Sequence, residues 1–149
     1  MKTNFGEFKV MTIRETATVS CETPESAIQY IRANIPNSSW FDREKEAFVC
    51  LLLNTRMRII GFNLVSLGNL NSVQIHPREV FRPAIVAAAN SIILVHNHPS
   101  DDTTPSEADI KCTRDLIRAG QVLKIEVNDH IIWSETKHCS LRELGYFYN

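Results

Sequence analysis

The sequence lacks the features that mark several large classes of protein. It has no excess of basic residues, because 16 Lys and Arg stand against 17 Asp and Glu and the formal net charge is −1. A nucleic-acid-binding domain is expected to carry clustered positive charge, so the composition argues against DNA or RNA as a partner. The longest apolar run, at residues 47–53, is far shorter than the roughly 20 residues that a membrane-spanning helix needs. We therefore expect no membrane segment.

Cysteine is sparse, and its spacing is unlike that of a cross-linked or zinc-binding scaffold. No two of the four cysteines form a C-x-x-C pair; they are Cys21, Cys50, Cys112 and Cys139. We expect reduced thiols, as in proteins of the cytosol. The N-terminus also lacks the apolar stretch of a secretion signal, so we predict a cytoplasmic location.

Neither repeats nor low-complexity segments divide the chain. Its 149 residues, 44% of them hydrophobic, fit one compact domain. The segment 9–20 is rich in Val, Ile and Thr and is predicted to form an edge strand or an arm. We therefore divide the chain into an N-terminal arm at 1–22 and a domain at 23–149. An exposed edge strand in the arm would let two chains pair, so a homodimer is one expectation.

Hydrophobic periodicity predicts an α/β fold. Helical spacing of apolar residues predicts helices at 24–34, 77–89 and 105–119. Short apolar runs predict strands at 46–54, 57–66, 91–96, 122–127 and 131–133. The strand at 46–54 is apolar at both alternating sets of positions, which is typical of a central strand covered on two faces. Pro83 is expected to interrupt the second helix and Gly120 to end the third. The expected architecture is a mixed sheet with helices on both sides.

Three side chains are predicted to meet beyond the end of the strand at 91–96. His96 and His98 are two residues apart on an extended chain, so both imidazoles project to the same side. Asp109 lies opposite the polar stripe of its helix and faces inward, where an isolated carboxylate is costly unless a cation compensates it. Two imidazoles and one carboxylate leave a fourth zinc position open, as in catalytic sites. The sequence therefore predicts zinc at His96, His98 and Asp109.

Two further polar residues complete the predicted site. Glu46 opens the central strand and is the candidate base that takes a proton from the attacking water. Ser106, one helical turn before Asp109, would donate a hydrogen bond to the developing oxyanion. The alternative is that Ser106 and Asp109 form a capping box, but Thr104 before Pro105 offers another N-cap that would leave both side chains free. Three other carboxylates also stay open as the base: Asp42, Glu44 and Glu107.

The arrangement of these residues resembles a known metallohydrolase motif. The run His96-Asn97-His98-Pro99, with Glu46 before it and Ser106 and Asp109 after it, is similar to the JAMM (MPN+/JAB) pattern E…H-x-H-P…S-x-x-D. Further segments resemble the RadC family, at 76–81, 93–100, 129–132 and 140–145. The resemblance covers the chain from about residue 23 to its end.

The resemblance implies a fold, a cofactor and an activity. It implies a sheet between helices in the cytidine-deaminase-like arrangement of JAB domains, with zinc on His96, His98 and Asp109. Some JAMM relatives cleave isopeptide bonds, so a peptide or protein is the implied substrate. RadC relatives also carry a historical DNA-repair label. The rivals to a hydrolase are thus a DNA-repair-associated accessory module, with a structural or vestigial zinc site, and a protein-binding scaffold.

The chain departs from the RadC pattern in two places. Asp101 stands where RadC proteins usually have glycine in HPSGD, so the loop cannot rely on the backbone freedom of glycine. Longer RadC proteins also carry an N-terminal helix-hairpin-helix-like region, and these 149 residues hold no counterpart, which weakens the expectation of DNA binding.

Other residues are given structural roles. Asp129 and His130 either form a buried, satisfied pair or orient a zinc histidine. His76 is expected to position the helix that follows it. Arg78 and Arg82 are expected to lie on a solvated helix face, and Cys112 to be a small core residue.

Overall fold

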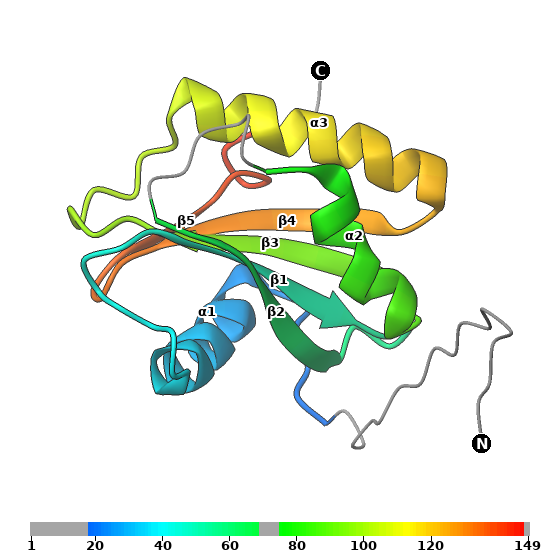
Figure 1. The fold of residues 1–149 in the computed structure, drawn as a ribbon, viewed down its shortest axis with the longest axis horizontal. Coiled ribbons are helices and arrows are strands. Elements are labelled where there is room, and N and C mark those ends of the chain that lie inside the picture. The colour runs from blue at the N-terminus through cyan, green and yellow to red at the C-terminus, as the bar shows by residue number, and fades with distance from the viewer. Residues whose placement is uncertain (1–17, 69–74, 148–149) are drawn as a thin grey trace, which may run out of the picture.

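The computed structural model describes residues 18–68 and 75–147, which form one mixed sheet with helices on both faces (Figure 1). The strands lie in the order β2-β1-β3-β4-β5. Their bounds are Ala47–Leu53 for β1, Ile59–Leu67 for β2, Ser91–Asn97 for β3, Glu126–Trp133 for β4 and His138–Ser140 for β5. Strands β3 and β4 run parallel, and all other neighbours run antiparallel. The predicted mixed sheet is confirmed.

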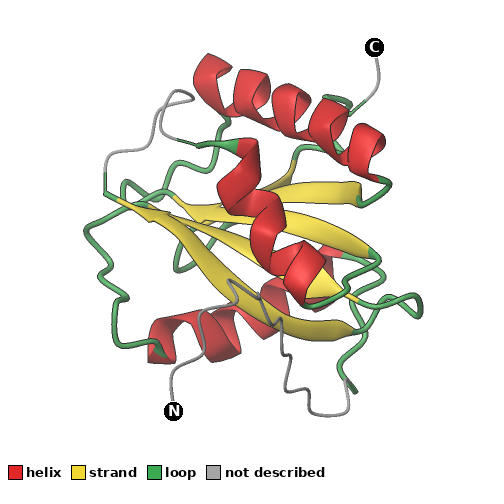
Figure 2. Ribbon diagram, turned by 45° about the vertical axis from the view of Figure 1, so that its right-hand side comes forward, coloured by secondary structure: helices red, strands yellow, loops and turns green. Residues whose placement is uncertain are grey.

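The helices cover the two faces unequally. Helix α1 (Pro24–Asn34), followed by a single 3-10 turn at Ile35–Asn37, lies under one face. Helices α2 (Pro77–Val86) and α3 (Glu107–Leu123) lie on the other face, as Figure 2 also shows. Within the described residues no helix is long and apolar enough to span a membrane.

Strand β1 holds the two halves of the core together. Every residue of β1 is buried. Val49 and Leu51 belong to the cluster that contains Ile31 of α1. Phe48 and Cys50 point the other way and belong to the cluster under α2 and α3. The alternation of strand side chains thus produces a central strand covered on two faces, as predicted.

Local features explain where helix α1 begins and where helix α2 ends. Thr23 caps α1 and forms a capping box with Ser26, and the predicted bounds of this helix are confirmed. Pro83, predicted to interrupt the second helix, lies inside it: α2 runs unbroken to Val86, three residues before the predicted end. The early end has a local cause, because Ala88 takes a left-handed backbone conformation (φ 51°) that a helix cannot continue.

The prediction that Gly120 ends the third helix is wrong. Helix α3 continues to Leu123 and ends at Lys124, whose backbone is left-handed (φ 59°). Gly120 lies inside the helix, and the segment that enters β4 passes close to it: a Cβ atom at this position would lie 2.5 Å from the carbonyl oxygen of Ile125. The glycine therefore permits close packing between α3 and the chain that enters β4.

This close approach predicts the effect of adding one methyl group. Gly120→Ala is expected to lower the free energy of unfolding by about 1–3 kcal/mol, the usual cost of overpacking, even though alanine favours helices. Urea denaturation measures the change. Gly61→Ala is the matched control, because a Cβ atom there meets nothing within 4 Å. An unchanged or raised midpoint for Gly120→Ala would contradict the packing argument.

Strand β4 also differs from its prediction. Residues 122–123 belong to α3, and the two strands predicted at 122–127 and 131–133 are one strand, Glu126–Trp133. Ile92 pairs with Val127 and Ile93 with Asp129, so Asn128 is an extra residue that forms a β-bulge. The bulge shifts the alternation of side chains by one position. As a result each of Asp129 and His130 faces the side of the sheet opposite to the one expected from uninterrupted alternation after Val127.

The N-terminal arm was predicted at 1–22, and residues 1–17 lie outside the described residues. At the described end of this segment Ser20 forms an isolated bridge with Arg58, and Cys21 is buried against the core. The domain boundary at Thr23 and the homodimer stay predictions.

Candidate metal centre

Three of the predicted site residues converge where β3 ends against the start of α3. His96 Nε2 lies 2.9 Å from His98 Nε2 and 3.3 Å from Asp109 Oδ1, and His98 Nε2 lies 3.5 Å from Asp109 Oδ2. Among the described residues this is the one group of three or more His, Cys, Asp or Glu side chains able to hold a metal ion. Two ligand atoms on a tetrahedral zinc ion are roughly 3.3 Å apart, given bonds of about 2.0–2.1 Å. The observed separations bracket that value, so these donors fit zinc.

A backbone carbonyl fixes the orientation of the His98 ring. His98 Nδ1 lies 2.7 Å from the carbonyl oxygen of Asp102. A carbonyl can only accept, so Nδ1 must carry the proton and donate it. The lone pair of Nε2 then points toward His96 and Asp109. This is the tautomer that a metal ligand requires.

The ionisation of Asp109 and His98 is coupled. Burial opposes the charged form of Asp109, but the hydrogen bonds that the His96 and His98 rings donate to it when they are protonated outweigh burial and hold its pKa well below the usual range. The same hydrogen bond with Asp109 raises the pKa of His98, and the nearby charge of Glu46 adds to this effect. The centre therefore favours an ionised carboxylate and stabilises positive charge beside it.

Ser106 and Asp109 form a capping box at the start of α3. Ser106 Oγ accepts a hydrogen bond from Asp109 N (3.0 Å), and Asp109 Oδ2 accepts one from Ser106 N (2.8 Å). The prediction that Thr104 caps the helix and leaves both side chains free is wrong. Thr104 N instead donates to Asp102 Oδ1 (3.0 Å), which keeps this segment in a turn before the helix begins at Glu107. The cap holds Oδ2 and leaves Oδ1 beside His96.

Asn97 positions the segment that carries Glu46. Asn97 Nδ2 donates to the carbonyl oxygen of Lys45 (2.9 Å), and Asn97 Oδ1 accepts from Ala47 N (2.8 Å). Both backbone neighbours of the half-buried Glu46 are thereby tied to the end of β3. The role of Asn97 was missed from the sequence. The signal for it was alternation, which turns a residue between two same-side histidines toward the opposite face, where a buried amide needs partners.

Asp129 and His130 do not pair with each other through their side chains. The Asp129 carboxylate accepts hydrogen bonds from the backbone N–H groups of His130 and Arg142 and from Ser140 Oγ. The His130 imidazole is fully buried on the opposite side of the sheet, and its Nε2 lies 2.7 Å from His96 Nδ1. Burial, with help from the charge of His96, holds the pKa of His130 well below its usual range. Of these two side chains, only that of His130 contacts a candidate metal ligand, His96.

Asp101 takes up the backbone conformation that glycine would supply. Its φ is 67°, in the left-handed region that Asp tolerates better than most residues. Thr136 Oγ1 donates to both carboxylate oxygens of Asp101, at 3.0 and 3.2 Å. The loop after His98 and the turn between β4 and β5 lie at the same end of the sheet (Figure 1), and this contact ties them together.

A cavity of about 420 Å³ opens beside the centre. His98, Pro99 and Asp101 are among the residues that line it. Phe41 and Trp133 also line it, and their rings stack with centroids 6.0 Å apart and an angle of 16° between their planes. The lining of the cavity therefore includes both a pair of aromatic rings and the candidate metal ligand His98.

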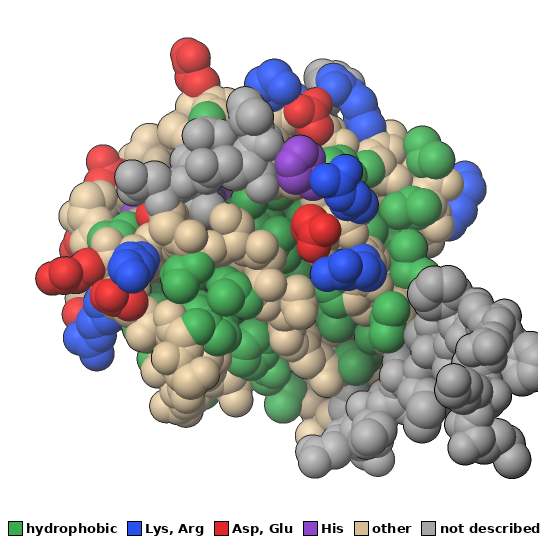
Figure 3. Space-filling model, viewed as in Figure 1, with side chains coloured by type: hydrophobic (Ala, Val, Ile, Leu, Met, Phe, Trp, Pro, Cys, Tyr) green, Lys and Arg blue, Asp and Glu red, His purple; other side chains and the backbone are tan. Residues whose placement is uncertain are grey.

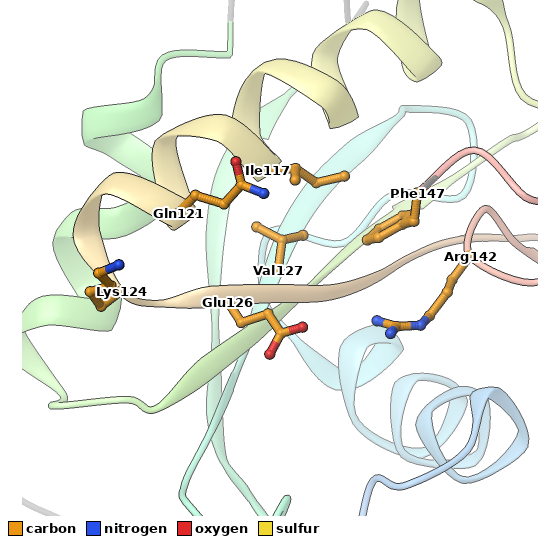
Figure 4. Close-up of a pocket in the computed structure, with 8 residues that line it drawn as sticks. Ile117, Gln121, Lys124, Glu126, Val127, Arg142 and Phe147 are labelled. Atoms are coloured by element: carbon orange, nitrogen blue, oxygen red, sulfur yellow. The ribbon is translucent and has the colours of Figure 1, made fainter. Parts of the chain in front are cut away.

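A second hollow, of about 380 Å³, lies near the C-terminal end of α3 (Figure 4). Ile117, Gln121 and Lys124 of the helix line it, together with Arg142 and Phe147. It shares no lining residue with the candidate metal centre, so it does not bear on the chemistry there.

The residues given structural roles take positions consistent with those roles. His76 is exposed and caps α2 through its backbone, and Arg82 forms an exposed ion pair with Glu79. Burial raises the pKa of the Cys112 thiol to about 12, so this residue close to Asp109 offers no thiolate. All four cysteines are free.

Comparison with known proteins identifies the family of the chain. Residues 21–146 match the family model described as RadC-like JAB domain. The chain is similar to a UPF0758 protein of Caldanaerobacter subterraneus, 43% identical over 128 residues that make up 86% of this chain and 53% of that protein. It is also similar to a UPF0758 protein of Staphylococcus haemolyticus, 50% identical over 77% of this chain and 50% of that protein. The chain spans about half the length of the curated relatives it matches.

Proposed function

Because the chain belongs to the RadC-like JAB domain family, we propose that it is a zinc-dependent hydrolase that cleaves an amide-type bond in a peptide or protein. The observation that carries the proposal is that His96 Nε2, His98 Nε2 and the Asp109 carboxylate converge, with the separations expected between ligands of one zinc ion. Three protein donors leave a fourth position for water or substrate, which distinguishes a catalytic zinc site from a closed structural one.

The chain's own residues supply the other parts of the mechanism. Zinc bound here would lower the pKa of an adjacent water and polarise the substrate carbonyl. The Asn97 side chain hydrogen-bonds the backbone on both sides of Glu46, at Lys45 and Ala47. Glu46 accepts the proton of the attacking water and passes it to the leaving amine. Ser106 donates to the oxyanion that develops on the substrate. Its Oγ uses a lone pair to cap α3, and no described residue accepts its proton, so this donation does not require the cap to break.

The cavity beside His98 supports a peptide as the substrate. A peptide whose scissile carbonyl lies at the metal centre would place a neighbouring side chain against the stacked rings of Phe41 and Trp133. Aromatic surfaces of this kind are favourable contacts for apolar side chains. The whole protein's substrate stays part of the proposal.

The face of the molecule seen in Figure 3 offers little support for a nucleic-acid function. Figure 3 shows acidic and basic side chains interspersed on one face, with no large basic patch on it. Together with the net charge of −1, this lowers the electrostatic attraction that phosphate backbones require.

The proposal is tested with the zinc-loaded protein and pools of quenched-fluorescent peptides, some linear and some joined through lysine side chains. We expect cleavage that a chelator abolishes and that added zinc, but not magnesium, restores. A protein that takes up no zinc would overturn the proposal. Zinc uptake without cleavage, combined with salt-dependent binding of duplex DNA, would favour the accessory module instead.

A further inference from the structure

A buried chain of three side chains leads from α3 through β4 to the metal centre. Thr113 and His96 are each 1% exposed, and His130 is not exposed at all. Thr113 Oγ1 lies 2.5 Å from His130 Nδ1, and His130 Nε2 lies 2.7 Å from His96 Nδ1. No water is needed to connect these groups, because each contacts the next directly. The far end of the chain is His96 Nε2, which faces His98 and Asp109.

The direction of each hydrogen bond in this chain follows from its first member. Thr113 Oγ1 lies 2.7 Å from the carbonyl oxygen of Asp109, one helical turn earlier, and a carbonyl can only accept. The hydroxyl of Thr113 therefore donates its single proton to that carbonyl oxygen. Toward His130 Nδ1 it can only accept, so His130 must carry a proton on Nδ1.

The same logic continues from His130 to His96. A neutral imidazole with its proton on Nδ1 has a lone pair on Nε2, so His130 Nε2 accepts from His96 Nδ1. His96 must then carry its proton on Nδ1 and keep the lone pair of Nε2. This is the nitrogen that faces the other two donors.

We propose that Thr113 and His130 are positioning residues that hold His96 in the tautomer and orientation needed to bind metal through Nε2. The inference rests on the proposed zinc site and adds to it a second layer of residues. His98 is oriented by the Asp102 carbonyl, whereas His96 is oriented by another side chain. Such outer partners commonly decide the tautomer and the basicity of a metal-binding histidine.

Packing restricts the rotation of both rings. Phe48 of β1 stacks on His96, with centroids 5.9 Å apart and planes 15° apart. The same Phe48 ring meets His130 edge to face, at 5.5 Å and 69°. The β-bulge at Asn128 sets the side-chain alternation that puts His130 on this side of β4. A one-residue change in register would turn His130 away from His96.

The tautomers are tested directly by nitrogen-15 NMR of the imidazole rings in the metal-free protein, at a pH where these rings are neutral. We expect His96, His98 and His130 all to carry the proton on Nδ1. A proton on Nε2 of His130 or of His96 would overturn the proposed direction of the chain. This measurement does not depend on metal binding, so it can be decided even if the zinc proposal fails.

The effect on metal binding is tested by competition for zinc with a chromophoric chelator. His130→Ala is expected to weaken zinc binding about 10–100-fold, the usual loss when the outer partner of a ligand is removed. Thr113→Val, which cannot accept from His130, is expected to weaken it in the same direction by less. Thr113→Ser keeps the hydroxyl and should restore the wild-type affinity.

The matched control is Ser140→Ala. It removes another buried hydroxyl of the β4 neighbourhood, one that donates to Asp129 (2.6 Å) on the opposite side of the sheet, and should leave zinc affinity unchanged. If wild type binds zinc, and both His130→Ala and Thr113→Val bind it equally well, the positioning role is refuted. If His130→Ala does not fold, the comparison of Thr113→Val with Thr113→Ser still decides. Wild type without zinc would refute the proposed function instead.

Discussion

Asparagine at Asp109 is expected to remove zinc from a protein that stays folded. The substitution keeps the size of the side chain but replaces an ionised carboxylate by a neutral amide, which is a poor zinc ligand. The loss of affinity should exceed about 100-fold, because removal of a mere outer partner already costs 10–100-fold. Elemental analysis should find about one zinc per chain in the wild type. The same analysis should find almost none in this variant, or in His96→Ala and His98→Ala.

The control must separate metal binding from helix capping, because Asp109 contributes to both. Thr23→Ala removes the corresponding N-cap of α1, which also belongs to a capping box, far from the centre in sequence. It should cost about 1 kcal/mol of stability and leave the zinc content at the wild-type level. Asp109→Asn with a full equivalent of zinc would show that this carboxylate is only a cap.

The capping box and the predicted metal ligand are compatible. From the sequence they were alternatives, since a side chain engaged in a cap was assumed to be unavailable. In the structure Asp109 Oδ2 accepts from Ser106 N, while Oδ1 stays 3.3 Å from His96 Nε2. The cap restricts the rotation of the carboxylate and so reduces the conformational entropy that a ligand loses on binding metal. A short sequence motif can therefore serve the helix and the metal centre together.

Local periodicity was enough to predict the main framework. The two-faced apolar pattern of 46–54 predicted a central strand, and alternation predicted that His96 and His98 share a side. Both follow from strand geometry alone. The inward direction of Asp109 followed from the helical stripe, even though the predicted helix began two residues too early. These features depend on neighbours within one element.

Features that depend on distant partners could not be predicted in the same way. His130 contacts His96 across 34 positions of sequence, and Asn97 contacts Lys45 across 52. The bulge at Asn128 reverses the side-chain alternation that the sequence suggests for this strand, and the local pattern of apolar and polar residues does not predict it. Gly120 is a similar case, because only the approach of Ile125 distinguishes a packing glycine from a helix stop.

Asp101, which stands where RadC proteins usually have glycine, shows how side-chain hydrogen bonds can stabilise a backbone conformation that glycine adopts freely. The sequence left the shape of this loop open, because a glycine was missing from it. Asp101 nevertheless adopts a positive φ, and its carboxylate accepts from Thr136. The hydrogen bonds offset part of the cost of the left-handed conformation. The loop that bears Pro99 is thereby anchored beside the cavity next to His98.

Glutamine at Glu46 is expected to abolish hydrolysis while leaving zinc in place. An amide cannot take a proton from the attacking water, and the loss of general acid–base catalysis typically lowers rates by about 100- to 10,000-fold. The substitution keeps the shape of the side chain, and the backbone bonds from Asn97 to Lys45 and Ala47 do not involve it. The measurement is the chelator-sensitive cleavage rate, at equal zinc content, on the best peptide found with the wild type.

The matched controls are two of the three other carboxylates that the sequence left open as the base. Glu44→Gln and Glu107→Gln change exposed side chains, and each should keep most of the activity. Full activity in Glu46→Gln, or a collapse of activity in Glu44→Gln instead, would move the base to another carboxylate. The zinc site itself would be unaffected by that result, since its donors are His96, His98 and Asp109, and the proposal for Glu46 would fail alone.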